Sequence, residues 1–160
     1  MKKIAAIVVT YNRRDLLIEC VDALRKYSPE TDIIVVNNAS TDGTEDALQE
    51  YIRKNQIIYF NTGANIGGAG GFNYGLKVAY QLEYKYFWLM DDDTIVQENS
   101  LKEIIYSARI LRNKWGFISG QAVWTDGAEC KMNRHKIKGN QRNISNEDNG
   151  LFAVKQATFV

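Results

Sequence analysis

Four short apolar runs, separated by helical patterns, constrain the fold of this chain more than any other feature. The runs cover residues 4–9, 33–37, 57–60 and 86–90. Apolar residues recur at helical spacing over 14–27, 44–54, 71–82 and 98–112. Strands that are nearly continuously apolar and alternate with helices predict an α/β protein, with a Rossmann-like, mostly parallel sheet and helices on both faces.

Each of the four predicted strands runs directly into a polar cluster. The clusters read TYNRR, NNASTDGT, NTGANIGGAGG and DDDT in chain order. Right-handed crossovers bring the carboxyl ends of parallel strands to one edge of the sheet. Ligands of such sheets bind at that edge, so we expect the four clusters to form one site.

Composition narrows the class of partner. The chain has 20 Lys and Arg against 19 Asp and Glu, a balance that does not support nucleic acid as a partner.

The apolar run 4–9 is shorter than the ~7 residues of a signal-peptide core, and no run approaches the ~20 residues of a membrane span. Two cysteines form no disulfide framework. We therefore expect a cytoplasmic location, with a peripheral membrane contact left open.

The three adjacent aspartates at 91–93 repel one another unless a cation lies between them. Hard divalent cations take oxygen ligands, and Mg²⁺ is typically held by one or two carboxylates together with phosphates. Asp91 and Asp93 can reach one ion if the chain turns at the strand end. The alternative is a solvated acidic turn in which Asp93 or Thr94 caps the following helix.

The other clusters each allow two interpretations. The glycine-rich stretch 61–75 matches neither G-x-G-x-x-G nor the P-loop pattern; its glycines bring backbone N–H groups close to an anion or pack a helix tightly on the sheet. The amides of Asn37 and Asn38 suit a base or ribose edge. Arg13 pairs with a phosphate or is simply solvated. Cys20 falls on the apolar face of its helix and is expected in the core, with a reactive thiol as the minor alternative.

In this order, VVTYNRRDLL, IIVVNNASTDGT, NTGANIGGAGGFNYG and FWLMDDDTIV resemble the family 2 glycosyltransferases with the GT-A fold. Within that family the chain looks most like the bacterial rhamnosyltransferase and galactofuranosyltransferase members. The resemblance implies a nucleotide-diphospho-sugar donor and Mg²⁺ or Mn²⁺ bridging its diphosphate. It places the metal on Asp91 and Asp93, and the donor nucleotide on Thr10, Tyr11, Arg13, Asn38, Asn65, Gly68, Asp91 and Asp92.

The resemblance also implies roles for individual residues. Asp92 matches the position nearer the ribose or donor sugar. Many members have an acidic residue where this chain has Asn38, and that departure leaves UDP and dTDP donors both open. The family inverts the anomeric centre in one displacement, in which a downstream carboxylate deprotonates the acceptor hydroxyl.

The implied function is therefore transfer of a sugar to a cell-surface polysaccharide or lipid-linked glycan, with association of the protein with the inner face of the membrane left open. Two alternatives remain: a non-catalytic nucleotide-sugar or metal-binding module, and a D-x-D-x-T phosphatase, which is disfavoured because Thr94 stands one place early.

We further expect residues 1–160 to be the nucleotide-sugar-binding part of a single GT-A domain that continues beyond Val160. The carboxylates after the aspartates, at 126, 129, 147 and 148, lie in loop-like sequence, so the catalytic base is expected downstream. The last ten residues have strand character, and an unfinished strand edge favours self-association.

Overall fold

The computed structural model describes residues 4–112 and 115–130, and the backbone of 154–159. The chain divides into two compact units, Met1–Thr94 and Ile95–Val160. The four polar clusters identified in the sequence all belong to the first unit.

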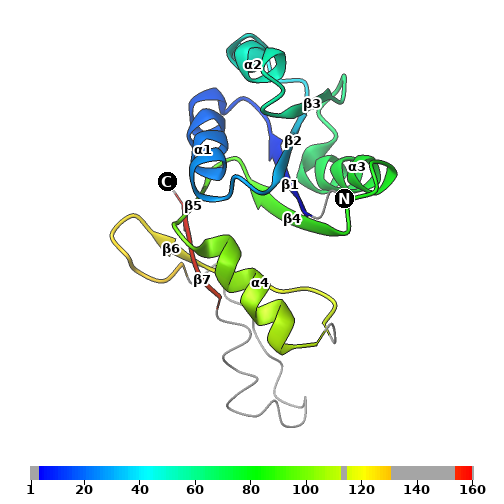
Figure 1. The fold of residues 1–160 in the computed structure, drawn as a ribbon. Helices are drawn as coiled ribbons and strands as arrows, with labels where there is room; N and C mark the ends of the chain where they lie inside the picture. Colours follow the sequence, from blue (N-terminus) through cyan, green and yellow to red (C-terminus); the bar gives the residue numbers. More distant parts are fainter. Residues whose placement is uncertain (1–3, 113–114, 131–153, 160) are drawn as a thin grey trace. The chain divides into compact units, whose positions relative to one another are not determined.

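A four-stranded parallel sheet forms the centre of the first unit. Its strands are β1 (Ile4–Thr10), β2 (Asp32–Asn37), β3 (Ile58–Asn61) and β4 (Tyr86–Asp91). Their spatial order is β3-β2-β1-β4, with every neighbouring pair parallel (Figure 1). The predicted parallel sheet is confirmed, and the carboxyl ends of all four strands lie at one edge.

Helices cover both faces of this sheet. They are α1 (Arg14–Tyr27), α2 (Thr44–Arg53) and α3 (Gly67–Gln81), and α1 and α3 lie on opposite sides of the strands (Figure 1). Alternate residues of a strand face opposite sides, so Ile7 and Val9 of β1 pack with Ala79 of α3. Cys20 of α1 is fully buried, which confirms its predicted place in the core.

Helix α3 begins four residues before the start expected from the sequence, at Gly67 instead of Gly71. The backbone N–H of Gly67 donates to Asn65 Oδ1 at 2.9 Å, and its carbonyl accepts from Asn38 at 3.1 Å. Gly67 has a φ of +74°, which glycine adopts without strain. The early start places Gly68 in the first turn of a helix and not in a loop.

Strand β5 (Thr94–Val96) begins at the last residue of the first unit, and the second unit continues with α4 (Ser100–Ile110), β6 (Gly120–Trp124) and β7 (Val154–Phe159). Its sheet has the order β5-β7-β6, with β6 and β7 parallel. Helix α4 begins after Asn99, so the alternative in which Asp93 or Thr94 caps the next helix was wrong: Thr94 opens a strand. The loop-like sequence that holds the carboxylates at 147 and 148 lies outside the described residues. None of the helices in the described ranges is long and apolar enough to cross a membrane.

Candidate functional site

The three aspartates stand at the carboxyl end of β4, and each has a different environment. Asp91 is the last residue of the strand, in register with Val9 of β1, and its side chain is exposed. The side chain of Asp92 is buried, whereas that of Asp93 is partly buried. The sequence predicted the position of this triad at the ligand edge, but not this difference in burial.

Asp92 joins the ends of β1 and β4. Its Oδ2 accepts a hydrogen bond from the Thr10 hydroxyl at 2.8 Å, and its Oδ1 accepts from Arg13 at 3.4 Å. Asp92 and Thr10 are 4% and 1% exposed. Burial raises the pKa of Asp92 above its usual value, although the Thr10 hydrogen bond and the Arg13 charge act in the opposite direction. These two hydrogen bonds thus hold the Asp92 carboxylate in place at the carboxyl end of β4.

Arg13 also reaches Asp93, and it does so more closely. Its Nη1 lies 2.9 Å from Asp93 Oδ2. The second oxygen of that carboxylate, Oδ1, is buried and has no hydrogen-bond partner among the described residues. Buried polar atoms are nearly always paired, so an unpaired carboxylate oxygen here is a position suited to a ligand that supplies positive charge.

The chemistry of the triad fits a divalent cation only in combination with another ligand. Although Asp91 is exposed as a residue, partial desolvation of its carboxyl group raises its pKa, and the nearby charge of Asp93 raises it further. In the part of the chain that the structure describes, no three Asp, Glu, His or Cys side chains converge to enclose an ion. Mg²⁺ nevertheless needs only one or two carboxylates when water and phosphate complete its coordination. Asp93 Oδ1 and the exposed Asp91 are the oxygens that fit this arrangement.

The loop after β1 is fastened to the loop after β2. Asn12 has a φ of +53°, a conformation that asparagine tolerates better than most residues. Its side chain accepts from the Thr41 N–H at 2.7 Å, and its own N–H donates to the Ser40 hydroxyl at 2.9 Å. The sequence analysis missed this role of Asn12. Its only sequence signal was an Asn two residues after the end of a strand, a residue type that favours turns.

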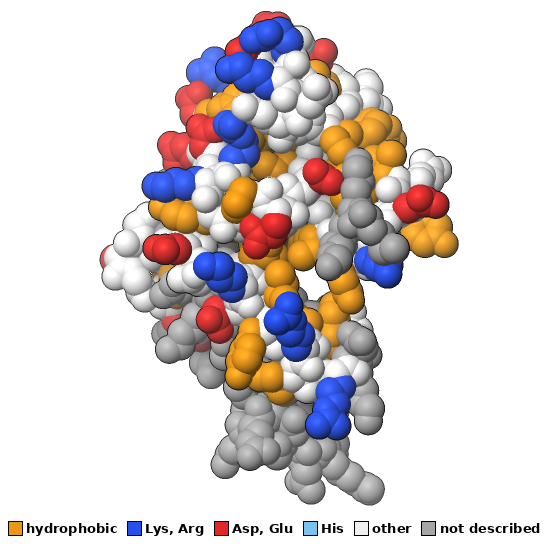
Figure 2. Space-filling model, viewed as in Figure 1, with side chains coloured by type: hydrophobic (Ala, Val, Ile, Leu, Met, Phe, Trp, Pro, Cys, Tyr) orange, Lys and Arg blue, Asp and Glu red, His pale blue; other side chains and the backbone are white. Residues whose placement is uncertain are grey.

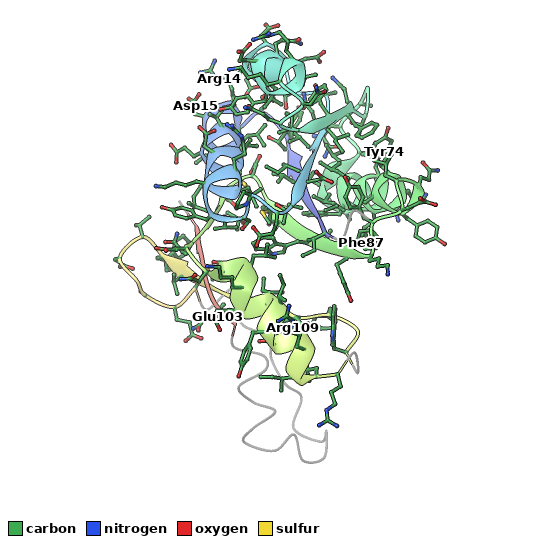
Figure 3. The ribbon with its side chains drawn as sticks, in the orientation of Figure 1. Arg14, Asp15, Tyr74, Phe87, Glu103 and Arg109 are labelled. Atoms are coloured by element: carbon green, nitrogen blue, oxygen red, sulfur yellow. The ribbon has the colours of Figure 1, made fainter. Side chains whose placement is uncertain are left out.

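The two adjacent arginines of this loop have different partners. Arg14 bonds Asp15 at 2.8 Å and touches the Asp42 carbonyl; the Arg14–Asp15 pair lies at the start of α1 (Figure 3). Of these two arginines, only Arg13 contacts the aspartate triad. Tyr11, in the same loop, is 45% exposed, so its ring is accessible to a ligand.

Asn38 lies at the end of β2 and is only 2% exposed. Its amide nitrogen donates to the Gly67 carbonyl, and its Oδ1 accepts from the Thr62 hydroxyl at 3.4 Å. The amide therefore ties the end of β2 to the start of α3. Contact with a base stays a prediction for this residue, and the structure adds a positioning role that the sequence did not reveal.

The glycines of the glycine-rich stretch divide into two kinds. A Cβ on Gly71 would lie 2.5 Å from Val9 Cγ1, so this glycine is needed for packing of α3 on the sheet. A Cβ on Gly67 or Gly68 would meet nothing within 4 Å. Tight packing of α3 on the sheet thus explains why residue 71 is a glycine, but it does not explain the glycine at position 68. Gly68 is exposed, as is Asn65 three residues earlier.

Charge on the visible surface is mixed, as the composition predicts. Lys and Arg side chains are interspersed with Asp and Glu on the face shown in Figure 2. This face carries no broad area of a single sign.

Comparisons with known proteins relate this geometry to a family. The sequence model of Glycosyl transferase family 2 matches residues 5–156. The chain is 34% identical over 93 residues to galactofuranosyltransferase GlfT1 of Mycolicibacterium smegmatis, covering 56% of this chain and 30% of that protein. It is 32% identical over 104 residues to poly(ribitol-phosphate) beta-glucosyltransferase of Bacillus spizizenii, covering 62% and 16%. The chain thus spans less than a third of the length of these relatives.

Solved structures show the same fold. Residues 1–349 of S. aureus TarS superpose with a TM-score of 0.65 at 23% identity, covering 88% of this chain and 40% of that one. The mannosyltransferase PcManGT of Pyrobaculum calidifontis, in complex with GDP-Man and Mn²⁺, gives a TM-score of 0.55 at 22% identity, covering 64% and 31%.

Proposed function

Because the chain belongs to Glycosyl transferase family 2 and has the GT-A fold, we propose that its strand-end site binds the nucleoside diphosphate of a sugar donor together with Mg²⁺ or Mn²⁺. The observation that carries this proposal is the unpaired, buried Oδ1 of Asp93 beside Asp91, at the carboxyl edge of a parallel sheet. Ligands of such sheets bind at this edge.

Asp91 and Asp93 are the proposed metal ligands. A bound divalent cation would supply positive charge to the diphosphate as it leaves the sugar. Asp92 keeps the strand ends together and faces the ribose or donor sugar. The neighbours support such a site: the PcManGT structure contains GDP-Man and Mn²⁺, and a structure of TarS residues 1–349 contains UDP-GlcNAc.

The surrounding loops complete the donor site. Arg13 binds the diphosphate through its guanidinium fork, a geometry that suits phosphate oxygens. Thr10 and Tyr11 line the nucleotide, and Asn38 contacts the edge of a uracil or thymine. Asn65 and Gly68 lie at the open first turn of α3, where backbone N–H groups accommodate the donor.

The proposed reaction is an inverting transfer from a UDP- or dTDP-sugar to a cell-surface polysaccharide or lipid-linked glycan. The names of the relatives indicate similar products, including poly-beta-1,6-N-acetyl-D-glucosamine in Staphylococcus epidermidis. The 160 residues are proposed to be the donor-binding part of one GT-A domain, with the catalytic base outside them. We place the protein at the cytoplasmic side of the membrane and leave self-association to be measured.

A calorimetric titration of nucleoside diphosphates with and without Mn²⁺ tests this function. UDP or dTDP is expected to bind more tightly with Mn²⁺ than without it, and more tightly than GDP or ADP. Asp93→Asn should remove the Mn²⁺-dependent part of the affinity, whereas Asp15→Asn, an exposed carboxylate outside the site, should not. Equal affinity for purine and pyrimidine diphosphates, or unchanged metal dependence in Asp93→Asn, contradicts the proposal.

The two alternative functions give different results in parallel assays. A non-catalytic module would bind nucleotide and metal but transfer no sugar even in the longest natural form of the protein. A phosphatase would hydrolyse a phosphate monoester such as p-nitrophenyl phosphate, and the proposed transferase would not.

A further inference from the structure

We propose that Arg13 is an internal counter-cation for the aspartate triad, and that it and the divalent cation compete for Asp93. Nucleotide binding then draws the guanidinium onto the diphosphate and removes a competing positive charge from the carboxylate that holds the metal. This inference rests on the proposed function of the site and adds to it an order of events and a residue that controls metal affinity.

The contacts of Arg13 show how one charge serves two carboxylates. Nη1 lies 2.9 Å from Asp93 Oδ2 and 3.4 Å from Asp92 Oδ1. In the described part of the chain these are the hydrogen bonds that its side chain makes, so Nε and Nη2 remain available as donors. The guanidinium stands on the same carboxylate, Asp93, that has the unpaired buried oxygen.

The backbone of Arg13 is fixed while its side chain can move. The Arg13 carbonyl accepts the first hydrogen bond of α1, from Leu17 at 3.0 Å, and the preceding residue Asn12 is fastened to Thr41. The side chain itself is 52% exposed. An exposed ion pair contributes little net stability, about 0–1 kcal/mol, so the guanidinium can leave Asp93 at small cost.

The negative charge of the aspartate triad requires a positive partner, which is either Arg13 or the divalent cation. Without Arg13 or a cation, the three consecutive carboxylates would keep their mutual repulsion, and buried Asp92 would retain only the Thr10 hydrogen bond. A divalent cation on Asp93 Oδ1 supplies the missing positive charge but repels the guanidinium on the other oxygen of the same carboxylate. A diphosphate beside the site gives the guanidinium a new anionic partner that accepts two parallel hydrogen bonds.

The proposal predicts how Mn²⁺ affinity responds to Arg13→Gln, measured by electron paramagnetic resonance of free Mn²⁺. Without nucleotide, the variant should bind Mn²⁺ about fivefold more tightly than the native chain, because an exposed ion pair worth about 1 kcal/mol no longer competes. With UDP present, the gain in Mn²⁺ affinity caused by the nucleotide should be about fivefold smaller in the variant, because the nucleotide relieves the competition by Arg13 in the native chain and finds none to relieve in the variant. Arg14→Gln is the matched control, since Arg14 is the neighbouring arginine and does not contact the triad; it should leave both values unchanged.

The outcomes separate this inference from the function on which it rests. If the native chain binds UDP with Mn²⁺ but Arg13→Gln binds Mn²⁺ no more tightly than native, the competition is refuted and the function stands. If neither chain binds Mn²⁺, with or without UDP, both proposals fail. Should Arg13→Gln be unfolded, far-UV circular dichroism decides: refolding on addition of Mn²⁺ supports the proposal, and failure to refold in excess Mn²⁺ overturns it.

Discussion

Gly71→Ala tests the packing that positions the donor site. The new Cβ would lie 2.5 Å from Val9 Cγ1 and 3.1 Å from Asn38 Nδ2, and Val9 belongs to the buried strand β1, which cannot move aside easily. Overpacking of this kind costs about 1–3 kcal/mol. Replacing glycine by alanine in a helix returns about 0.5–1 kcal/mol, so the net loss of stability is expected to lie between about 0 and 2.5 kcal/mol.

Gly68→Ala is the matched control, because it lies in the same helix and its Cβ would meet nothing within 4 Å. Both variants gain helix propensity, so the difference between them isolates the overpacking. Urea denaturation followed by circular dichroism should show Gly68→Ala about 1–3 kcal/mol more stable than Gly71→Ala, or higher in melting temperature by several degrees. If the two variants are equally stable, the close packing of α3 on β1 is wrong.

Three further predictions concern other residues near the site. Thr10→Val should lower the free energy of unfolding by about 1–3 kcal/mol, because buried Asp92 loses its hydrogen bond from the Thr10 hydroxyl. This loss of stability should shrink as the pH falls through the raised pKa of Asp92 and the carboxyl becomes protonated. Thr10→Ser should have nearly the native stability at every pH. Asn38→Ala should weaken UDP or dTDP binding by about 1–3 kcal/mol, in calorimetry at a temperature where the variant is folded; native affinity would exclude the base contact. Cys20 should resist alkylation by iodoacetamide until the chain unfolds, because burial raises the pKa of its thiol; rapid labelling of the native chain would contradict its place in the core.

The strands and helices of the first unit could be predicted because their patterns are local. Helix α1 has the expected bounds, since its apolar face recurs regularly from Leu17 to Leu24. The start of α3 could not be predicted in the same way. Glycines disfavour helix by propensity, and one of the two hydrogen bonds at the start of this helix comes from Asn38, 29 residues away in the chain.

The position of the candidate site could also be predicted, but its internal arrangement could not. Strand ends indicate where the aspartates gather, because chain topology alone brings those ends together. Which aspartate is buried depends on the pairing of β4 with β1, which places Asp92 against Thr10, 82 residues apart. The sequence left Arg13 with two interpretations, a phosphate ligand or a solvated residue, and neither included its contact with Asp93, 80 residues away.

A crystal structure with UDP and Mn²⁺, with anomalous data collected at the manganese edge, tests the central claim most directly. The account predicts an anomalous peak roughly 2 Å from Asp93 Oδ1, at coordination distance, with UDP phosphate oxygens on the same ion and the Arg13 guanidinium turned from Asp93 to the diphosphate. A manganese peak away from Asp91 and Asp93, or UDP bound at another edge of the sheet, would contradict it.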